Sequence, residues 1–347
     1  GEWGNRISVM IGDGLSDPTN LFRLNVIVGG EVVESYPNLS IDESSANYVE
    51  RVVNGRSEYI TVTDLTGPGF SYNDSPGMGH YTLIGGSNGI DGMSDSDYIG
   101  DPHQRMGLFA FDEVEDLNLL CLPGVSTASV ITSGIAYAEG RKDLLFLAET
   151  PMMLKPQEAV SFRKGQSPYN YYGAFNSSYA ALYYPWLEVT DPLTGKTKIV
   201  PPTGAVAGCM ARSDQKTEVW YAPAGIDRGR IFGALSPAYK TSRGERDVLY
   251  ADGVNVIASF PDTGINIWGQ KTLQSQPFAT DRVNVRRLMM YVEEAISQSS
   301  RFVVFEPHNA QTWRALVRLI SPFLQGIKSR GGLFDYRVQC DEETTTP

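Results

Sequence analysis

A helical segment between two apolar runs, in the first half of the chain, is the feature that constrains the fold most. Residues 118–122 and 143–148 are rich in leucine and are typical of strands buried on both faces of a sheet. Pro123-Gly124 ends the first run, and a helix is expected over residues 126–140. Two strands joined through a helix form a βαβ unit, in which the strands are parallel and the crossover is right-handed. The sequence therefore predicts an α/β domain.

The beginning of the chain follows a different pattern. Residues 6–11 and 22–28 alternate polar and apolar side chains, which is typical of half-buried strands. A glycine pair then predicts a tight turn into a third strand at 31–34. A short helix is expected at 48–53, and β-branched residues predict a further strand at 59–63.

The composition changes after this first section. No Lys or Arg occurs between Arg56 and Arg105, where Gly and Ser are frequent. We expect a small β-rich domain over residues 1–70 and a larger α/β domain over residues 71–347, which starts with an acidic, loop-rich segment at 67–105. The fold class is α/β in the larger domain and α+β overall, with a mixed sheet flanked by helices.

Helices and strands are also predicted in the second half of the chain. Residues 177–186 form an aromatic-rich strand in this prediction. From Asp281 onward, apolar residues recur at spacings of three and four, which indicates an amphipathic helix. A strand is expected at 301–305 and a helix at 313–320. Ser321-Pro322 is typical of an N-cap and first helical position, so we expect another helix to begin there.

The charge and the cysteines exclude several classes of protein. There are 29 Lys and Arg against 40 Asp and Glu, and the net charge of −11 argues against direct contact with nucleic acid. Residues 118–138 are uncharged, but Pro123-Gly124 and several Ser and Thr interrupt them, so no membrane insertion is expected. Cys121, Cys209 and Cys340 belong to no C-x-x-C pair, which excludes a disulfide scaffold and a zinc ribbon.

Ser126 is the one candidate nucleophile. It follows Gly124 between a predicted strand and a predicted helix, where a hydrolase nucleophile would lie, and His308 comes late enough to complete a Ser…Asp…His order. The motif has Ala128 where Gly is usual, and an N-cap after a Pro-Gly turn accounts for Ser126 better than a nucleophile does. We favour the N-cap. No P-loop, H-E-x-x-H or strict G-x-G-x-x-G pattern occurs, so no catalytic site and no cofactor are predicted.

Acidic residues in the loop-rich segment raise the question of a metal site. Their spacing does not match the twelve-residue EF-hand loop, and a solvated acidic loop is the favoured interpretation. The three histidines lack partners at metal-ligand spacing, so no metal is predicted. The residues concerned are Asp91, Asp95, Asp97, Asp101, His80, His103 and His308.

Several segments, in order along the chain, resemble the contractile phage tail sheath family. The resemblance spans nearly the whole chain, and several motifs in order are more specific than one. The motifs are Gly1-Glu2-Trp3-Gly4-Asn5, Leu122-Pro123-Gly124, Tyr184-Pro185-Trp186, Pro201-Pro202-Thr203-Gly204, Ala211-Arg212-Ser213-Asp214, Ala222-Pro223-Ala224-Gly225, residues 264–273, residues 281–288 and Phe305-Glu306-Pro307-His308-Asn309.

The resemblance implies a structural role without a catalytic residue or a cofactor. Sheath subunits stack as hexameric rings around a tail tube, and contraction drives the tube through the host envelope for genome ejection. The implied partners are neighbouring sheath subunits, the tail tube protein, the baseplate and the tail terminator. The implied location is the virion tail, assembled in the host bacterial cytoplasm. A bacteriocin or a type VI-like contractile injection system would use a similar sheath.

The resemblance also implies linking arms. In the family, an N-terminal arm and a C-terminal extension add strands to neighbouring subunits by β-augmentation. This sequence begins near the Gly-x-Trp-Gly-Asn motif and ends at Pro347, about where the extension would start. We therefore expect a fragment that lacks both arms and is a monomer.

Four basic residues are candidates for contact with the tube. Arg314, Arg318, Lys328 and Arg330 fall in a segment, 309–330, that contains no Asp or Glu. Arg314 and Arg318 lie one helical turn apart on one face. A solvated helix face accounts for them as well as a strip that meets an acidic tube surface.

Two other functions stay open. An α/β hydrolase rests on the βαβ unit and Ser126 alone. A host-surface binding module is suggested by 18 Tyr and 5 Trp and would require an exposed aromatic cleft. Against it, Tyr179, Tyr183 and Trp186 are expected in the core of an aromatic strand.

Overall fold

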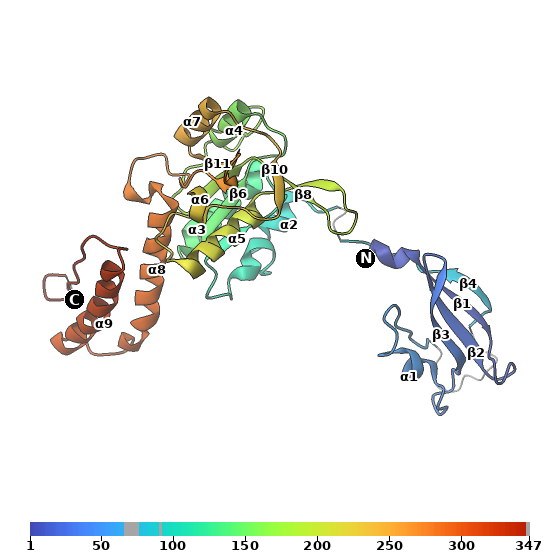
Figure 1. The fold of residues 1–347 in the computed structure, drawn as a ribbon. Coiled ribbons are helices and arrows are strands. Elements are labelled where there is room, and N and C mark those ends of the chain that lie inside the picture. Colours follow the sequence, from blue (N-terminus) through green and yellow to red (C-terminus); the bar gives the residue numbers. More distant parts are fainter. Residues whose placement is uncertain (66–75, 90–91, 345–347) are drawn as a thin grey trace. The chain divides into compact units, whose positions relative to one another are not determined.

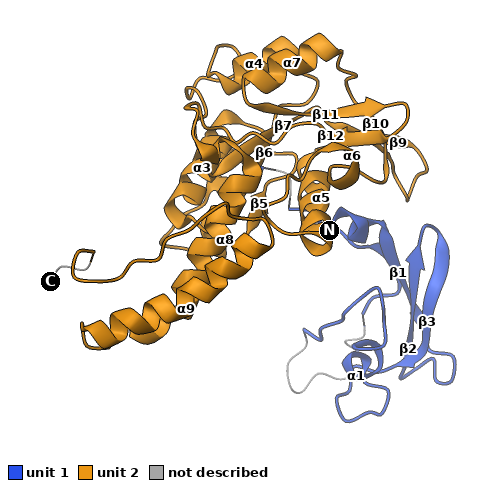
Figure 2. Cartoon of the chain, turned by 60° about the vertical axis from the view of Figure 1, so that its left-hand side comes forward, with its two compact units in different colours: residues 1–93 blue, residues 94–347 orange. Residues whose placement is uncertain are grey.

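A computed structural model describes residues 1–65, 76–89 and 92–344 of the chain. The chain forms two compact units, Gly1–Met93 and Ser94–Pro347 (Figures 1 and 2). Each unit has its own hydrophobic core, and each is described by itself below.

The first unit is an antiparallel sheet covered by one short helix. The strand order is β3-β2-β1-β4, and Val26 and Leu39 are fully buried in its core together with Val53 of the helix. This arrangement confirms the strands predicted at 6–11, 22–28 and 31–34 and the helix predicted at 48–53. The elements are the 3-10 helix η1 (Glu2–Arg6), β1 (Ile7–Asp13), β2 (Phe22–Val28), β3 (Glu31–Leu39), α1 (Val49–Val53) and β4 (Gly79–Thr82).

The strand predicted at residues 59–63 does not form. Side chains take the backbone amides that a strand ladder would use: the Ile60 amide donates to Ser57 Oγ at 3.0 Å and the Val62 amide to Asn54 Oδ1 at 2.8 Å. Ser and Asn side chains compete with regular structure in this way. The prediction was wrong because β-branched residues favour a strand only where a partner strand is available.

The division between the units falls after Met93, whereas the sequence placed it after residue 70. The strand β4 accounts for the difference, because it pairs with β1 and so extends the first sheet. Ser8 lies opposite Thr82 in this pairing, and His80 Nε2 lies 2.9 Å from Ser8 Oγ.

The second unit is built on a five-stranded mixed sheet, as predicted. The order is β12-β11-β7-β6-β5, in which β5, β6, β7 and β11 are parallel and β12 is antiparallel to β11. The parallel pairing of β5 with β6 through α3 confirms the βαβ unit. The strands are β5 (Leu119–Cys121), β6 (Leu145–Glu149), β7 (Ala180–Tyr184), β11 (Val254–Phe260) and β12 (Gly264–Ile267), and a second sheet of order β10-β8-β9 contains β8 (Leu187–Thr190), β9 (Thr197–Val200) and β10 (Ala234–Pro237).

Helices cover both faces of the five-stranded sheet, because successive residues of a strand point to opposite faces. Phe146 and Leu182 belong to one core cluster, while Leu145, Leu147 and Tyr183 belong to the other. On the first face, α4 and α7 lie side by side with α3 beneath them (Figure 2). The helices are α2 (Asp95–Ile99), η3 (Gly107–Phe111), α3 (Ala128–Arg141), α4 (Pro156–Arg163), α5 (Thr203–Lys216), α6 (Gly225–Arg228), α7 (Arg243–Ala251), η4 (Ala279–Asp281), α8 (Val283–Ser299), η5 (Arg301–Val303) and α9 (Ala310–Ser329).

Two predictions near the end of the chain were wrong. The strand expected at 301–305 is the 3-10 helix η5 followed by a turn, in which Phe305 has a positive φ of 73°. The helix expected to begin at Ser321-Pro322 is instead the second half of one continuous helix, with Pro322 inside it. Packing of Leu324 and Ile327 against Leu288 and Trp220 offsets the hydrogen bond that proline cannot donate.

Candidate functional site

The helix α9 carries the four candidate basic residues, and the structure separates them into two pairs. Arg314 and Arg318 are exposed on the first half of the helix. Their Nε atoms donate along the helix, to Ala310 O at 2.9 Å and to Arg314 O at 3.3 Å. Neither guanidinium forms an ion pair with a carboxylate in the part of the chain that the structure describes. Within the described residues, both positive charges are therefore exposed and without a paired carboxylate.

Lys328 and Arg330 behave differently, because the fold brings carboxylates to them. Lys328 Nζ lies 3.0 Å from Asp335 Oδ1, and Arg330 Nη1 lies 2.7 Å from Glu218 Oε1. The Arg330 guanidinium also lies 5.1 Å from the ring centroid of Trp220, a cation–π distance. Glu218 is 112 residues away in sequence, so the absence of acidic residues from 309–330 gave no sign of this pair. These two side chains fix the end of α9 to its own chain.

The end of α9 packs onto α8, so the two helices form an antiparallel hairpin (Figure 1). Leu288 of α8, with Leu324 and Ile327 of α9, closes on the Trp220 side chain, which is 7% exposed. Burying these side chains stabilises the contact by about 1.5–3 kcal/mol for each fully buried residue. The first half of α9 contributes no residue to this buried cluster and presents Arg314 and Arg318 outward.

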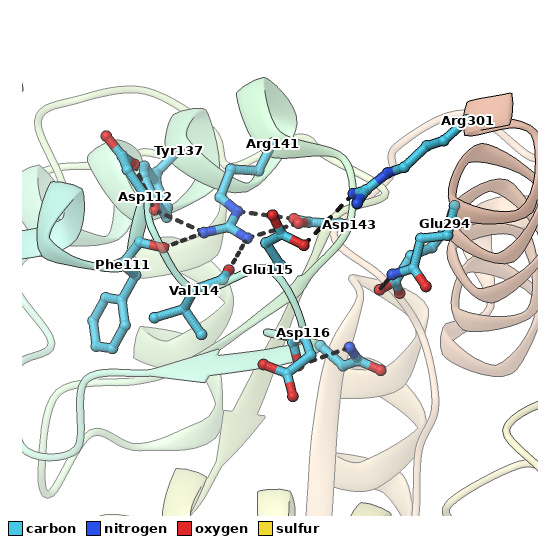
Figure 3. A network of polar contacts seen from close by, with 12 residues as sticks. Phe111, Asp112, Val114, Glu115, Asp116, Tyr137, Arg141, Asp143, Glu294 and Arg301 are labelled. Carbon is cyan, nitrogen blue, oxygen red and sulfur yellow. Dashed lines mark hydrogen bonds and ion pairs between the residues drawn. The ribbon is translucent and has the colours of Figure 1, made fainter. Parts of the chain in front are cut away.

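An arginine network holds the loop before β5 beside α8 (Figure 3). Arg141 donates to the carbonyl oxygens of Phe111 at 2.5 Å and Val114 at 2.7 Å, and its Nη2 pairs with Asp143 at 2.7 Å. Glu294 of α8 faces this network, and burial, reinforced by Asp143, raises the pKa of its carboxyl. The residues line an open pocket of about 470 Å³ between α8 and the end of α3.

Ser126 is neither the N-cap of α3, which is Thr127, nor paired with a catalytic residue among those that the structure describes. In the described part of the chain no hydrogen bond joins it to a histidine, and His308 packs instead edge-on against Trp313, with ring centroids 5.2 Å apart. The neighbouring Gly124 amide donates to Glu149 Oε1 at 2.6 Å, and Thr203 Oγ1 donates to Glu149 Oε2 at 2.6 Å. A buried carboxylate thus joins the turn before α3 to the start of α5. Burial raises the pKa of this Glu149 carboxyl.

The acidic residues of the loop-rich segment have structural partners. Asp97 closes a capping box with Ser94 at the start of α2, and the Asp95 carboxylate accepts from Ser129 Oγ. Asp101 accepts from the His103 amide at 2.8 Å, and Asp91 lies outside the described residues. Within residues 1–65, 76–89 and 92–344, no group of three His, Cys, Asp or Glu side chains could hold a metal ion.

The aromatic strand lies in the core, as predicted. Tyr183 is fully buried, Tyr179 packs against both core clusters, and Trp186 Nε1 donates to Thr150 O at 2.8 Å.

Among the described residues, no helix is long and apolar enough to cross a membrane.

Comparison with known proteins connects this architecture to a family. Residues 93–273 match the model of the phage tail sheath protein central domain, and residues 275–346 match that of the phage tail sheath C-terminal domain. The first match alone covers more than half of the chain. The chain belongs to the phage tail sheath family. The resemblance found in the sequence motifs is thereby confirmed.

Relatives from several contractile systems are similar to this sheath chain. The tail sheath protein of Enterobacteria phage T4 is 30% identical over 84% of this chain and 45% of its own length. That of Vibrio phage KVP40 is 29% identical over 93% of this chain and 50% of its own length. The chain therefore spans about half the length of these curated relatives.

Solved sheath structures share the fold. The PVC sheath complex of an extracellular contractile injection system, in its contracted state, is 26% identical, with a TM-score of 0.56 over 67% of this chain and 62% of that one. A sheath tail protein from Desulfitobacterium hafniense is 15% identical, with a TM-score of 0.61 over 95% of this chain and 67% of that one. At that identity the likeness shows the fold alone.

The two matched sheath domains meet between residues 273 and 275, and ion pairs join them elsewhere. Arg287 of α8 makes a double contact with Asp214 of α5, through Nη1 at 2.9 Å and Nη2 at 2.5 Å. The Arg287 side chain is 5% exposed and that of Asp214 is 24% exposed. Arg301 and Glu115 add a contact of 3.5 Å at the surface. The buried pair fixes α8 against the central domain.

Proposed function

We propose that this chain is the structural subunit of a contractile tail sheath. Subunits stack as hexameric rings around a tail tube, and contraction drives the tube through the host envelope for genome ejection. The observation that carries the proposal is the succession of two sheath domains, central and C-terminal, over residues 93–346. The sheath performs no catalysis in this proposal, because the free energy is stored in the extended polymer.

The proposed partners are neighbouring sheath subunits, the tail tube protein, the baseplate and the tail terminator. Similarity to chains in the baseplate and contracted sheath of the anti-feeding prophage supports self-assembly and contact with a baseplate. The proposed location is the virion tail, assembled in the cytoplasm of the host bacterium.

A second candidate is the sheath of a contractile injection system that carries no genome. The 26% identity to the PVC sheath favours it as a close variant of the first proposal. Purified particles decide between the two, because a genome-filled capsid accompanies the sheath only in a phage.

Within this function, Arg314 and Arg318 are proposed to face the tube. They are exposed, they point the same way on α9, and no carboxylate of the described chain neutralises them. An acidic tube surface would hold the extended sheath in register through such a strip. Lys328 and Arg330 were candidates for the same strip, but their charges are already paired within the chain. The proposed strip is therefore Arg314 with Arg318.

Charge reversal tests the strip. In sheath co-assembled with tube, Arg314→Glu with Arg318→Glu should prevent extended sheath from forming on tubes, as seen by electron microscopy. The matched control is Lys196→Glu with Lys198→Glu, two exposed residues of the β8–β9 hairpin. Normal extended sheath from both double variants would refute the strip, and discrete small particles from the full-length protein with its linking arms would refute the sheath itself.

A further inference from the structure

A pocket of about 350 Å³ lies where the two matched sheath domains meet. Arg163, at the end of α4, and the turn after α7 line it from the central domain. Lys271 and the segment that follows it line the other wall, up to Asp281. Nothing described above uses this pocket, and its wall contains a buried cation.

Arg163 is only 9% exposed, and its guanidinium has no carboxylate partner in the described chain. Its Nη2 atom donates to Leu273 O at 3.0 Å and to Ser275 Oγ at 3.1 Å. Nε has no hydrogen-bond partner among the described residues. Asp252 is near enough to act on this charge, but its carboxylate is paired with Lys164. Arginine stays charged at every physiological pH, and a buried charge without a paired carboxylate of its own is costly, so a further carboxylate at this position would be favourable.

The carboxylates of the pocket are already occupied by other cations. Asp252 pairs with Lys164 at 2.8 Å, and Asp281 lies 3.5 Å from Arg282. Lys271 Nζ donates to the carbonyl of Ala251, the residue before Asp252, at 3.3 Å and lies 4.8 Å from the centroid of the Tyr250 ring. It forms no ion pair with a carboxylate of the described residues. The lining itself holds two cations, Arg163 and Lys271, and two carboxylates, and both carboxylates already pair with cations outside the lining. Burial, and next the nearby Arg282, lower the pKa of Lys271, and the charges of Asp281 and Asp252 offset only part of this effect.

We propose that this pocket binds a carboxylate, and that an Asp or Glu side chain of a second copy of the chain supplies it. Arginine binds carboxylates through two parallel hydrogen bonds, and lysine adds a point charge. The chain has 40 acidic residues to offer. In a polymer of identical subunits, which is the function proposed above and on which this inference rests, each pocket meets a second copy at high effective concentration. A carboxylate seated there would touch both matched domains.

Zero-length carbodiimide cross-linking tests the occupant directly, since it joins an amine to a carboxylate only in contact. Sheath is assembled from a mixture of ¹⁴N- and ¹⁵N-labelled chains, cross-linked, and digested for mass spectrometry. The expected product links Lys271 of one isotope to an acidic peptide of the other. If intermolecular links form at other lysines while Lys271 links only to Asp252 or Asp281 of its own chain, the inference is refuted. The assembly uses the full-length protein with its linking arms, and if that protein forms no sheath, the proposed function fails instead.

A titration of the isolated chain tests the pocket without any polymer. Acetate at low ionic strength should cause saturable shifts in the NMR signals of the Gly253 and Ser275 amides. Lys271→Gln should weaken this binding about tenfold, the effect of losing one charge-assisted contact. The control Lys198→Gln, on the β8–β9 hairpin, should leave acetate binding unchanged. Absence of saturation, or equal binding by both variants, refutes the pocket. Tighter binding of sulfate than of acetate, without the intermolecular cross-link, would mean a free anion and refute the second copy.

Discussion

Removing one partner of the Arg287–Asp214 pair should destabilise the second unit strongly. In Asp214→Asn the Arg287 side chain, 5% exposed, keeps its charge and loses its counter-ion. Breaking a fully buried pair costs about 3–5 kcal/mol. Because Asp214 is 24% exposed, water reaches this side of the pair, and we expect a loss of about 2–3 kcal/mol. In a unit of this size that corresponds to a fall in the unfolding temperature of roughly 4–12 °C.

The measurement is urea unfolding of the unmodified chain and the variant, followed by circular dichroism and by tryptophan fluorescence. Trp220 reports on the α8–α9 hairpin, because it packs against Leu288. The matched control is Asp335→Asn, which breaks the surface pair with Lys328, where the side chains are 74% and 38% exposed. That change should cost less than about 1 kcal/mol. If the two variants lose stability equally, burial of Arg287 does not determine how strongly this pair stabilises the contact between α8 and α5, and the reasoning is refuted.

Two further predictions concern buried groups of the second unit. Because burial raises the pKa of Glu149 in the folded state, the folded chain holds this proton more tightly than the unfolded chain does. Stability should therefore fall as pH rises from the ordinary carboxyl range through the raised pKa, and Glu149→Gln should lack this component in urea unfolding measured across a pH series. Gly134→Ala in α3 would place a Cβ 2.5 Å from the Phe146 ring and should destabilise by about 1–3 kcal/mol. Gly208→Ala, with open space around its Cβ on α5, should instead stabilise by about 0.5–1 kcal/mol, and thermal unfolding separates the two.

The parts of the fold that were predictable are those in which local pattern and burial agree. The apolar runs at β5 and β6 predicted buried parallel strands because hydrophobic side chains on both faces of a strand require cover on both. The predicted strand at 59–63 failed because Ser57 and Asn54 offered the backbone nearer partners. The expected break at Pro322 failed because Leu324 and Ile327, beyond it, have a core to reach. In both cases a contact between residues determined the local structure, which secondary-structure propensity alone did not predict.

The same limit applies to the four basic residues that are predicted to face the tube. Sequence spacing placed Arg314 and Arg318 on one helix face, and the structure leaves both exposed. The same spacing included Arg330, whose partner Glu218 lies 112 residues away and meets it only after α9 has packed on Trp220. Whether a charge is free for a partner depends on which opposite charges the fold brings within reach.

Arg163 is the clearest example, because nothing in its sequence context distinguishes it from an ordinary surface arginine. It precedes Lys164 at the end of a short helix, where basic residues are ordinary and favourable. Folding separates the two: Lys164 takes Asp252, and Arg163 is buried with Nε unpaired against the segment that joins the sheath domains. A catalytic site gathers residue types that a motif can describe. A contact site between subunits has no such motif. It can consist of a charged side chain that the fold leaves without an opposite charge, and it is recognised only after the ion pairs around it have been identified.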